Sequence, residues 1–302
     1  MNSLKKITLD DKAIFDKFLR SGHHLLSAYS FQNIFIWKDL FDIYWMIIDD
    51  ALCIFFEDPN GFFMHLPPLG TAPTAEMLGK IFDLLQDRNA SKDSPLASRI
   101  ANIEEADIPA FSDLGYKCVA VSSDYISFRE SLASLEGNHF KAKRACFNHF
   151  IKNNKFEYAD LKQEHGADCL ALYNYWMTEK RKKKRSKVFF DMMQDNFIAL
   201  NVLFENFQQL EIRGKIIRMN GALKAFTLGF MLNWETFCIQ YEISDLSIKS
   251  LAQFIFSSFC RELDCRFINV MDDSGMEELR KVKLSYHPEK IVHSYTTARR
   301  NF

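Results

Sequence analysis

Long apolar runs are missing from this sequence of 302 residues. The longest candidate lies between Phe41 and Phe56, and three aspartates interrupt it, at 42, 49 and 50. A membrane-spanning helix needs about 18 or more consecutive apolar residues, so the sequence predicts no membrane span. Residues 1–11 also lack the apolar core of a secretory signal peptide. We therefore expect a cytoplasmic protein.

Residue clusters that bind metals are scarce as well. The seven cysteines include no Cys-x-x-Cys pair, and His23-His24 is the one clustered histidine pair. Adjacent side chains on a helix diverge, so this pair is a poor metal site. An odd number of cysteines without paired spacing fits reduced thiols better than a disulfide framework. We expect neither a metal site nor disulfides.

A large net charge is absent too, because 38 lysines and arginines oppose 39 aspartates and glutamates. No overall field therefore attracts the molecule to nucleic acid or to an anionic membrane. The charge is uneven, however: residues 139–187 hold 13 basic against five acidic residues, an excess of eight. The densest part, Lys180–Lys187, is typical of a solvated loop, of a surface that attracts phosphate or RNA, or of a nuclear-targeting signal. These alternatives stay open.

The pattern of apolar residues predicts an α+β protein of two units. Helical spacing at 11–20, 29–40 and 74–86 accompanies a hairpin at 43–57 and a strand at 62–66. A strand at 156–161, helices at 167–180 and 188–205, three antiparallel strands within 209–243, a helix at 247–262 and a strand at 267–270 follow. The repeated order indicates two mixed, largely antiparallel sheets, each covered by helices. We place the units at residues 1–137 and 138–302.

The last strand of the meander alternates in a simple way. In a regular strand, successive side chains lie on opposite faces of the sheet. One face should carry Phe237, Ile239, Tyr241 and Ile243, and the other Thr236, Cys238, Gln240 and Glu242.

A basic helix is predicted over residues 138–153, at the start of the second unit. Phe140, Phe147 and Ile151 form its apolar stripe, with Arg144 and Asn148 at the border. The Arg144 side chain either extends past the apolar face to solvent or points into a cleft and holds an anion.

Polar residues also gather between 269 and 286. A strand ends near Asn269, and Asp272 follows before a helix on which Leu279 and Lys283 share a face, with Arg280 beside them. A structural ion-pair network and a ligand-binding site both explain this arrangement.

Several ordered blocks of the chain resemble a known family, the carboxy-terminal domain of bacterial phosphatidylglycerol lysyltransferases and its soluble relatives. The matching blocks are Asp124-Tyr125-Ile126, Leu132–Leu135 with Gly137, Phe140–Arg144 through Asn148 and Phe150, Lys224–Gly229, Tyr241-Glu242, Asn269 with Asp272–Gly275, Leu279–Pro288 and Tyr295. The resemblance covers most of residues 60–298.

This resemblance implies two tandem GNAT-like units that move an acyl or aminoacyl group from an activated donor to an amine or hydroxyl. It implies acyl-CoA or aminoacyl-tRNA as co-substrate, so tRNA is a possible partner, and a small molecule or lipid headgroup as acceptor. No cofactor is firmly implied. By the same resemblance, the catalytic candidates are Asp272, Glu242 and Tyr286, and the residues that bind donor or substrate are Lys141, Lys143, Arg144, Asn148, Lys224, Asn269, Arg280 and Lys283.

The chain also departs from the family pattern. Relatives have an Arg-Glu pair where this chain has Val270-Met271, and a glycine where it has Ser250. A side chain at residue 250 crowds a pyrophosphate that approaches the helix amino terminus. These departures favour a second hypothesis, in which the protein is a non-enzymatic descendant of the same fold that binds a ligand or acts as a scaffold. A phosphate- or RNA-binding module is the third.

Overall fold

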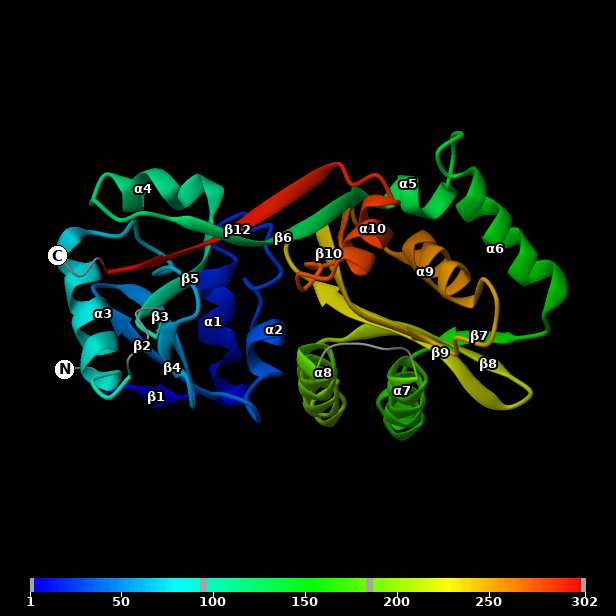
Figure 1. Cartoon of the computed structure of the whole chain (residues 1–302), viewed down its shortest axis with the longest axis horizontal. Coiled ribbons are helices and arrows are strands. Elements are labelled where there is room, and N and C mark those ends of the chain that lie inside the picture. Colours follow the sequence, from blue (N-terminus) through cyan, green and yellow to red (C-terminus); the bar gives the residue numbers. More distant parts are fainter. Residues whose placement is uncertain (1–2, 93–96, 183–186, 300–302) are drawn as a thin grey trace. The chain divides into compact units, whose positions relative to one another are not determined.

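The computed structural model describes residues 3–92, 97–182 and 187–299. These residues divide into two compact units (Figure 1). The first contains the described residues up to Asp124, the short segment Asp272–Met276 and the residues from Ile291 onward; the second contains Tyr125–Met271 and Glu277–Lys290. We expected the boundary between the units after residue 137, whereas the first stretch of the first unit ends at Asp124. The carboxy-terminal strand belongs to the first unit because it pairs there with a strand of residues 99–104.

The first unit is built on a mixed sheet. Its strands are β1 (Lys5–Lys6), β2 (Asp42–Ile48), β3 (Ala51–Asp58), β4 (Gly61–Met64), β5 (Arg99–Glu104) and β12 (Lys290–Ala298), adjacent in that order. Only the pair β4–β5 is parallel. The predicted hairpin is confirmed: Asp49 and Asp50 connect β2 to β3 with positive φ angles of 47° and 65°, as a tight two-residue hairpin turn requires.

Helices of the first unit cover this sheet. They are α1 (Lys12–Leu19), α2 (Phe31–Phe35), α3 (Ala75–Arg88) and α4 (Ile108–Ser112), with short 3₁₀ turns at Leu9–Asp11 and Glu105–Asp107. Thr74 caps α3, because its hydroxyl accepts a hydrogen bond from the Met77 amide at 3.1 Å. The helix expected over 29–40 is much shorter in the structure, where α2 ends at Phe35 and turns follow.

The second unit has the predicted antiparallel meander. Its strands are adjacent in the order β6 (Val119–Phe128, which enters from the first unit), β11 (Phe267–Asn269), β10 (Thr236–Ser244), β9 (Ala222–Met231), β8 (Arg213–Met219) and β7 (Glu157–Asp160). The pair β10–β11 is parallel and the others are antiparallel.

Both faces of this second sheet are covered, as the apolar pattern of its strands predicts. Figure 1 shows α7 (Gly166–Arg181) and α8 (Lys187–Glu205) on one face, and α6 (Lys141–Asn153) and α9 (Leu251–Glu262) on the other. A short 3₁₀ turn (Gln163–His165) precedes α7; α5 (Arg129–Ser134) and α10 (Glu277–Leu284) complete the unit. Aromatic contacts bind the two helices of one face to each other, such as Phe147 of α6 against Phe254 of α9 at a ring distance of 5.1 Å.

A β-bulge in β10 overturns the predicted alternation of this strand. Ile239 is paired with Gly229 and Tyr241 with Leu228, so Gln240 is an additional residue in β10. Phe237 and Ile239 pack against α9. Tyr241 instead faces α7 and α8, because its hydroxyl donates a hydrogen bond to the Asn196 carbonyl at 2.9 Å. The next residue, Glu242, therefore lies on the α9 face together with Phe237, and not opposite it.

Candidate active site

The inner face of α6 differs from the predicted stripe by one residue. Phe140, Phe147 and Phe150 are buried, whereas Ile151 is 47% exposed. The spacing 140, 143, 147 and 150 is that of one helix face, so Lys143 lies on the inner face of α6. The prediction that Ile151 completes the stripe was wrong, because Phe150 fills the space against Phe254 at a ring distance of 4.7 Å.

Lys143 lies against a tyrosine that three helices hold in place. Its Nζ atom is 3.6 Å from the ring centroid of Tyr286, in the segment after α10, a cation–π geometry. The Tyr286 hydroxyl donates a hydrogen bond to Oε1 of Gln253 at 2.8 Å, and Nε2 of Gln253 donates one to Ser257 Oγ at 2.9 Å. Burial raises the pKa of Tyr286 well above its usual value, with the Glu242 charge as a further cause. The hydroxyl therefore stays protonated at neutral pH.

Glu242 completes this cluster from β10. Glu242 as a whole residue is exposed to solvent. The protein around its carboxyl nevertheless desolvates this group and raises its pKa to about 8, and the Lys143 charge acts against this shift. Desolvation also lowers the pKa of Lys143, and here Glu242 opposes the shift. Among the residues that the structure describes, no ion pair joins the two groups. A carboxyl whose pKa lies near working pH can accept and return a proton.

Three predicted residues thus come together in the second unit: Lys143, Glu242 and Tyr286. An acid with a raised pKa can move a proton and a nearby amine can stabilise a developing negative charge, while the Tyr286 ring holds that amine in place. Sequence reasoning missed Gln253 and Ser257, which hold the tyrosine. The signal was present, because these polar residues are four apart on a helix that is otherwise apolar on its inner side.

The other residues predicted on α6 lie elsewhere. Nη1 of Arg144 donates hydrogen bonds to the carbonyl oxygens of Leu135 and Gly137, the latter at 2.7 Å, and so closes the end of α5. Lys141 and Asn148 are exposed. The role of Lys141, Arg144 and Asn148 in donor binding stays a prediction. Arg144 also has a structural role, because it bonds to the main chain.

The other residues predicted between 269 and 286 do not lie together. Asn269 is fully buried and accepts a hydrogen bond from the Met271 amide at 2.6 Å; Nζ of Lys283, also buried, donates one to the Val270 carbonyl at 2.6 Å. These two side chains fix the chain after β11. Arg280 is exposed on α10. Asp272 belongs to the first unit, where its Oδ1 accepts a hydrogen bond from Ser274 at 3.3 Å.

Lys224 lies in a different part of the second unit. Its Nζ atom forms an ion pair with Asp245 at 2.9 Å, in a pocket of about 440 Å³ that Asp168 and Arg218 also line. The structure therefore does not group it with Glu242. Of the basic run Lys180–Lys187, residues 183–186 lie outside the described residues. Lys180 packs its Nζ atom over the Trp176 ring at 5.1 Å.

Comparison with known families identifies the chain. The sequence profile described as "Phosphatidylglycerol lysyltransferase, C-terminal" matches residues 20–298. The chain belongs to this family. The resemblance noted in its sequence blocks is thus confirmed across nearly the whole length. Curated proteins give no match to this member of the family.

Solved structures support the fold of this family member. A conserved protein of unknown function from Bacteroides thetaiotaomicron is 26% identical, with a TM-score of 0.88 over 99% of this chain and 100% of its own. The L-PGS of Bacillus licheniformis has 15% identity and a TM-score of 0.65 over 99% and 94%. A tandem GNAT protein from the clavulanic acid pathway has 7% identity and a TM-score of 0.51 over 100% of both chains.

These likenesses confirm the predicted α+β fold of GNAT-like units. The sequence profile makes the chain a member of a lysyltransferase family. Within the described part of the chain, no helix has both the length and the apolar character that crossing a membrane needs.

Ser250, one of the departures predicted from the family pattern, has a strained main chain. It precedes α9 with a φ angle of 69°, and its buried hydroxyl has no hydrogen-bond partner among the described residues. Side chains other than glycine cost about 1–2 kcal/mol in this left-handed region. Because the change relieves this strain and removes a buried hydroxyl, we expect Ser250→Gly to stabilise the protein by about 1 kcal/mol, measured by urea unfolding.

The matched control for this prediction is Asp50→Gly. It relieves a similar φ angle of 65° at an exposed turn and removes no buried hydroxyl, so we expect a smaller gain. An equal gain for the two variants contradicts the part assigned to the hydroxyl, and a loss of stability in Ser250→Gly contradicts the strain.

Proposed function

We propose that this protein is an acyl- or aminoacyltransferase whose chemistry takes place at Lys143, Glu242 and Tyr286. The observation that carries the proposal is the Glu242 carboxyl, whose pKa is raised to about 8 beside a desolvated lysine. A structural ion pair shifts an acid in the other direction. Membership of a lysyltransferase family supplies the reaction class.

In the proposed reaction, an acceptor amine or hydroxyl attacks the carbonyl carbon of an activated ester or thioester. A bond forms from the acceptor to this carbon, and the bond from the carbon to the leaving oxygen or sulfur breaks. Glu242 takes the proton of the acceptor and returns it to the leaving group. Lys143 stabilises negative charge on the carbonyl oxygen, and Tyr286, whose hydroxyl proton is donated to Gln253, positions the lysine through its ring. Because the donor is already activated, positioning supplies much of the remaining acceleration.

Aminoacyl-tRNA and acyl-CoA are the proposed donor classes, and a lipid headgroup or a small molecule is the proposed acceptor. Exposed Lys141 and Arg280, together with Asn148, are the residues proposed to contact the donor or acceptor. Asp272 stays a proposed second base. A panel of radiolabelled aminoacyl-tRNAs and acyl-CoAs, each with phosphatidylglycerol vesicles and with small amines, tests the proposal by direct detection of product.

Lys143→Met tests the site with the donor that the panel identifies. We expect the rate of transfer to fall about 100-fold, because a positive charge near the carbonyl oxygen is lost. Lys152→Met is the matched control, since Lys152 is exposed in the last turn of the same helix. Equal rates for Lys143→Met and wild type exclude Lys143 from the chemistry.

A non-enzymatic descendant is the second candidate, and the strained Ser250 together with Val270 and Met271 favours it. Its signature is saturable binding of one donor without any product. A phosphate- or RNA-binding module differs again, because its binding weakens steeply as the salt concentration rises.

A further inference from the structure

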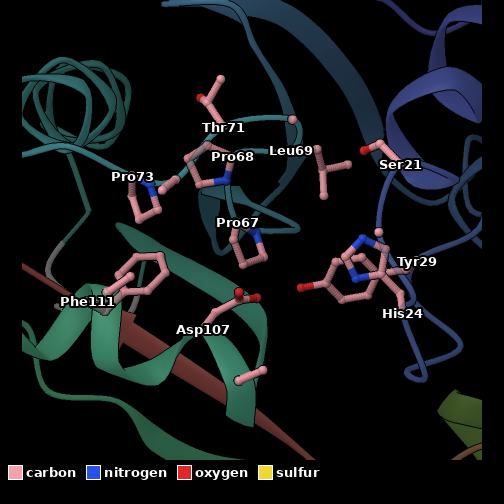
Figure 2. A pocket seen from close by; sticks show the side chains of 15 residues that line it. Ser21, His24, Tyr29, Pro67, Pro68, Leu69, Thr71, Pro73, Asp107 and Phe111 are labelled. Atoms are coloured by element: carbon pink, nitrogen blue, oxygen red, sulfur yellow. The ribbon is translucent and has the colours of Figure 1, made fainter.

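The first unit contains a pocket far in sequence from the cluster at Glu242. It has a volume of about 340 Å³, which is in the range of small-molecule sites. The loop of residues 67–73, rich in proline, forms one wall, and α4 with the preceding 3₁₀ turn forms another. Figure 2 shows Pro67 and Pro73 above the pocket, Phe111 at one side and the rings of His24 and Tyr29 at the other.

The wall opposite Phe111 is fixed by its own hydrogen bonds. His24 and Tyr29 stack at a ring distance of 4.1 Å. Nδ1 of His24 lies 2.8 Å from Oε2 of Glu104, and the other oxygen of Glu104 accepts hydrogen bonds from the amides of Leu25 and Leu26. The Tyr29 hydroxyl donates to the Asn102 carbonyl at 2.8 Å. Glu104 is therefore satisfied within the protein, and this wall is preorganised.

Asp107 is different, because its carboxylate has no such partners. Among the described residues it forms no hydrogen bond and no ion pair, and it is the one acidic residue that lines the pocket. In Figure 2 the carboxylate points toward the middle of the pocket, facing Pro67 and the ring pair. Burial and, to a smaller extent, the nearby Glu104 charge raise the pKa of Asp107, whereas His24 acts to lower it. A half-buried carboxylate without a hydrogen-bond partner is available to pair with a cationic ligand.

The remaining lining decides which cation fits. No lysine or arginine lines the pocket, and the His24 imidazole that does line it is already paired with Glu104. One carboxylate can pair with either an ammonium or a guanidinium group, and the ammonium is the more compact of the two cations. Proline and phenylalanine side chains offer apolar surface to the rest of the ligand, and aromatic faces attract a nearby cation.

We propose that this pocket binds a primary ammonium compound with a small apolar body, with Asp107 as the anionic anchor. The site lies within the first unit. The proposal goes beyond the transferase function and does not rest on it, since no step of that reaction uses Asp107.

The test compares three probes of one shape on the full-length protein at pH 7: benzylamine, which is charged as benzylammonium, neutral benzyl alcohol and anionic benzoate. Titrations followed by ligand-observed NMR give each Kd. We expect benzylammonium to bind with a Kd on the order of 1 mM, as fragments do, and at least about ten times more tightly than benzyl alcohol, a difference of about 1.4 kcal/mol. Benzoate should bind still more weakly.

Asp107→Asn should weaken benzylammonium binding about tenfold or more and leave benzyl alcohol unaffected. Glu105→Gln is the matched control: it removes the same charge two residues away, from an exposed side chain outside the lining, and should change the Kd less than about twofold. Equal binding of the charged and neutral probes, no saturable binding, or an unchanged Kd in Asp107→Asn overturns the proposal.

Thermal unfolding supplies a second measurement. Asn removes an unpartnered charge, so the Tm of Asp107→Asn should equal or exceed that of the wild type. A clear fall in Tm means that the carboxylate is a structural group, and that outcome also overturns its assignment to a ligand.

Discussion

Glu242→Gln is expected to reduce the rate of acyl transfer by about 10²–10⁴-fold, the usual contribution of a general base. The amide has nearly the shape of the carboxyl, so the variant should still fold and bind donor. Wild-type kcat/KM should rise with pH and level off above about 8, because only the ionised Glu242, whose pKa is about 8, accepts the proton. In Glu242→Gln this rise should be absent.

Glu289→Gln is the control, since Glu289 is an exposed acid of the same unit. Its rate and pH profile should match those of the wild type. A profile that rises near the usual pKa of a glutamate, about 4.3, contradicts the desolvated carboxyl. A Glu242→Gln variant with full activity removes Glu242 from the mechanism and leaves Asp272 as the candidate base.

Stability should change with pH in a way that supports the same assignment. The folded-state pKa of Glu242 is raised above its unfolded value, so the folded state holds the proton more tightly and loses relative stability as pH rises from about 4.5 to about 8. Glu242→Gln removes this pH-dependent loss of stability. Because the side chain is exposed, solvent screens the effect, and we expect Glu242→Gln to gain about 1 kcal/mol over wild type between pH 5 and pH 9.

Gly229→Ala is expected to cost more than about 3 kcal/mol of stability and to abolish transfer. A Cβ atom at residue 229 overlaps the carbonyl oxygen of Cys238 on the neighbouring strand. This overlap is removed only if β9 and β10 separate beside the bulge. Overpacking of this kind costs about 1–3 kcal/mol or more. Because the bulge turns Glu242 toward α9, any fold that survives should lose the raised pKa.

Gly79→Ala provides the contrast for this prediction. Gly79 lies in α3, and nothing lies within 4 Å of a Cβ placed there. Alanine is favoured over glycine inside a helix by about 1 kcal/mol, so this variant should gain stability. Urea denaturation of both variants gives the comparison, and an unperturbed Gly229→Ala contradicts the close approach of the two strands.

Much of the fold follows from local pattern. The Asp49-Asp50 turn, the helix at 74–86 and the meander of β8, β9 and β10 were predicted because turn residues and apolar spacing act over a few residues. The inner face of α6 was predicted wrongly, because local pattern did not distinguish between two neighbouring apolar residues. Phe150 and Ile151 are both apolar, and the choice between them moves Lys143 into the site and Arg144 out of it.

The sequence by itself determined the α+β class, the family and the residue types of the site, because periodicity, turn chemistry and ordered blocks are properties of the chain. Only the tertiary structure decided which of these residues meet. The bulge at Gln240 reverses the face of every later residue in β10, and no local signal marks it. The carboxy-terminal strand joins the first unit through pairing with β5, which depends on residues almost 200 positions apart. The environment that raises the pKa of Glu242 arises in the same way, from side chains that different helices bring to one place.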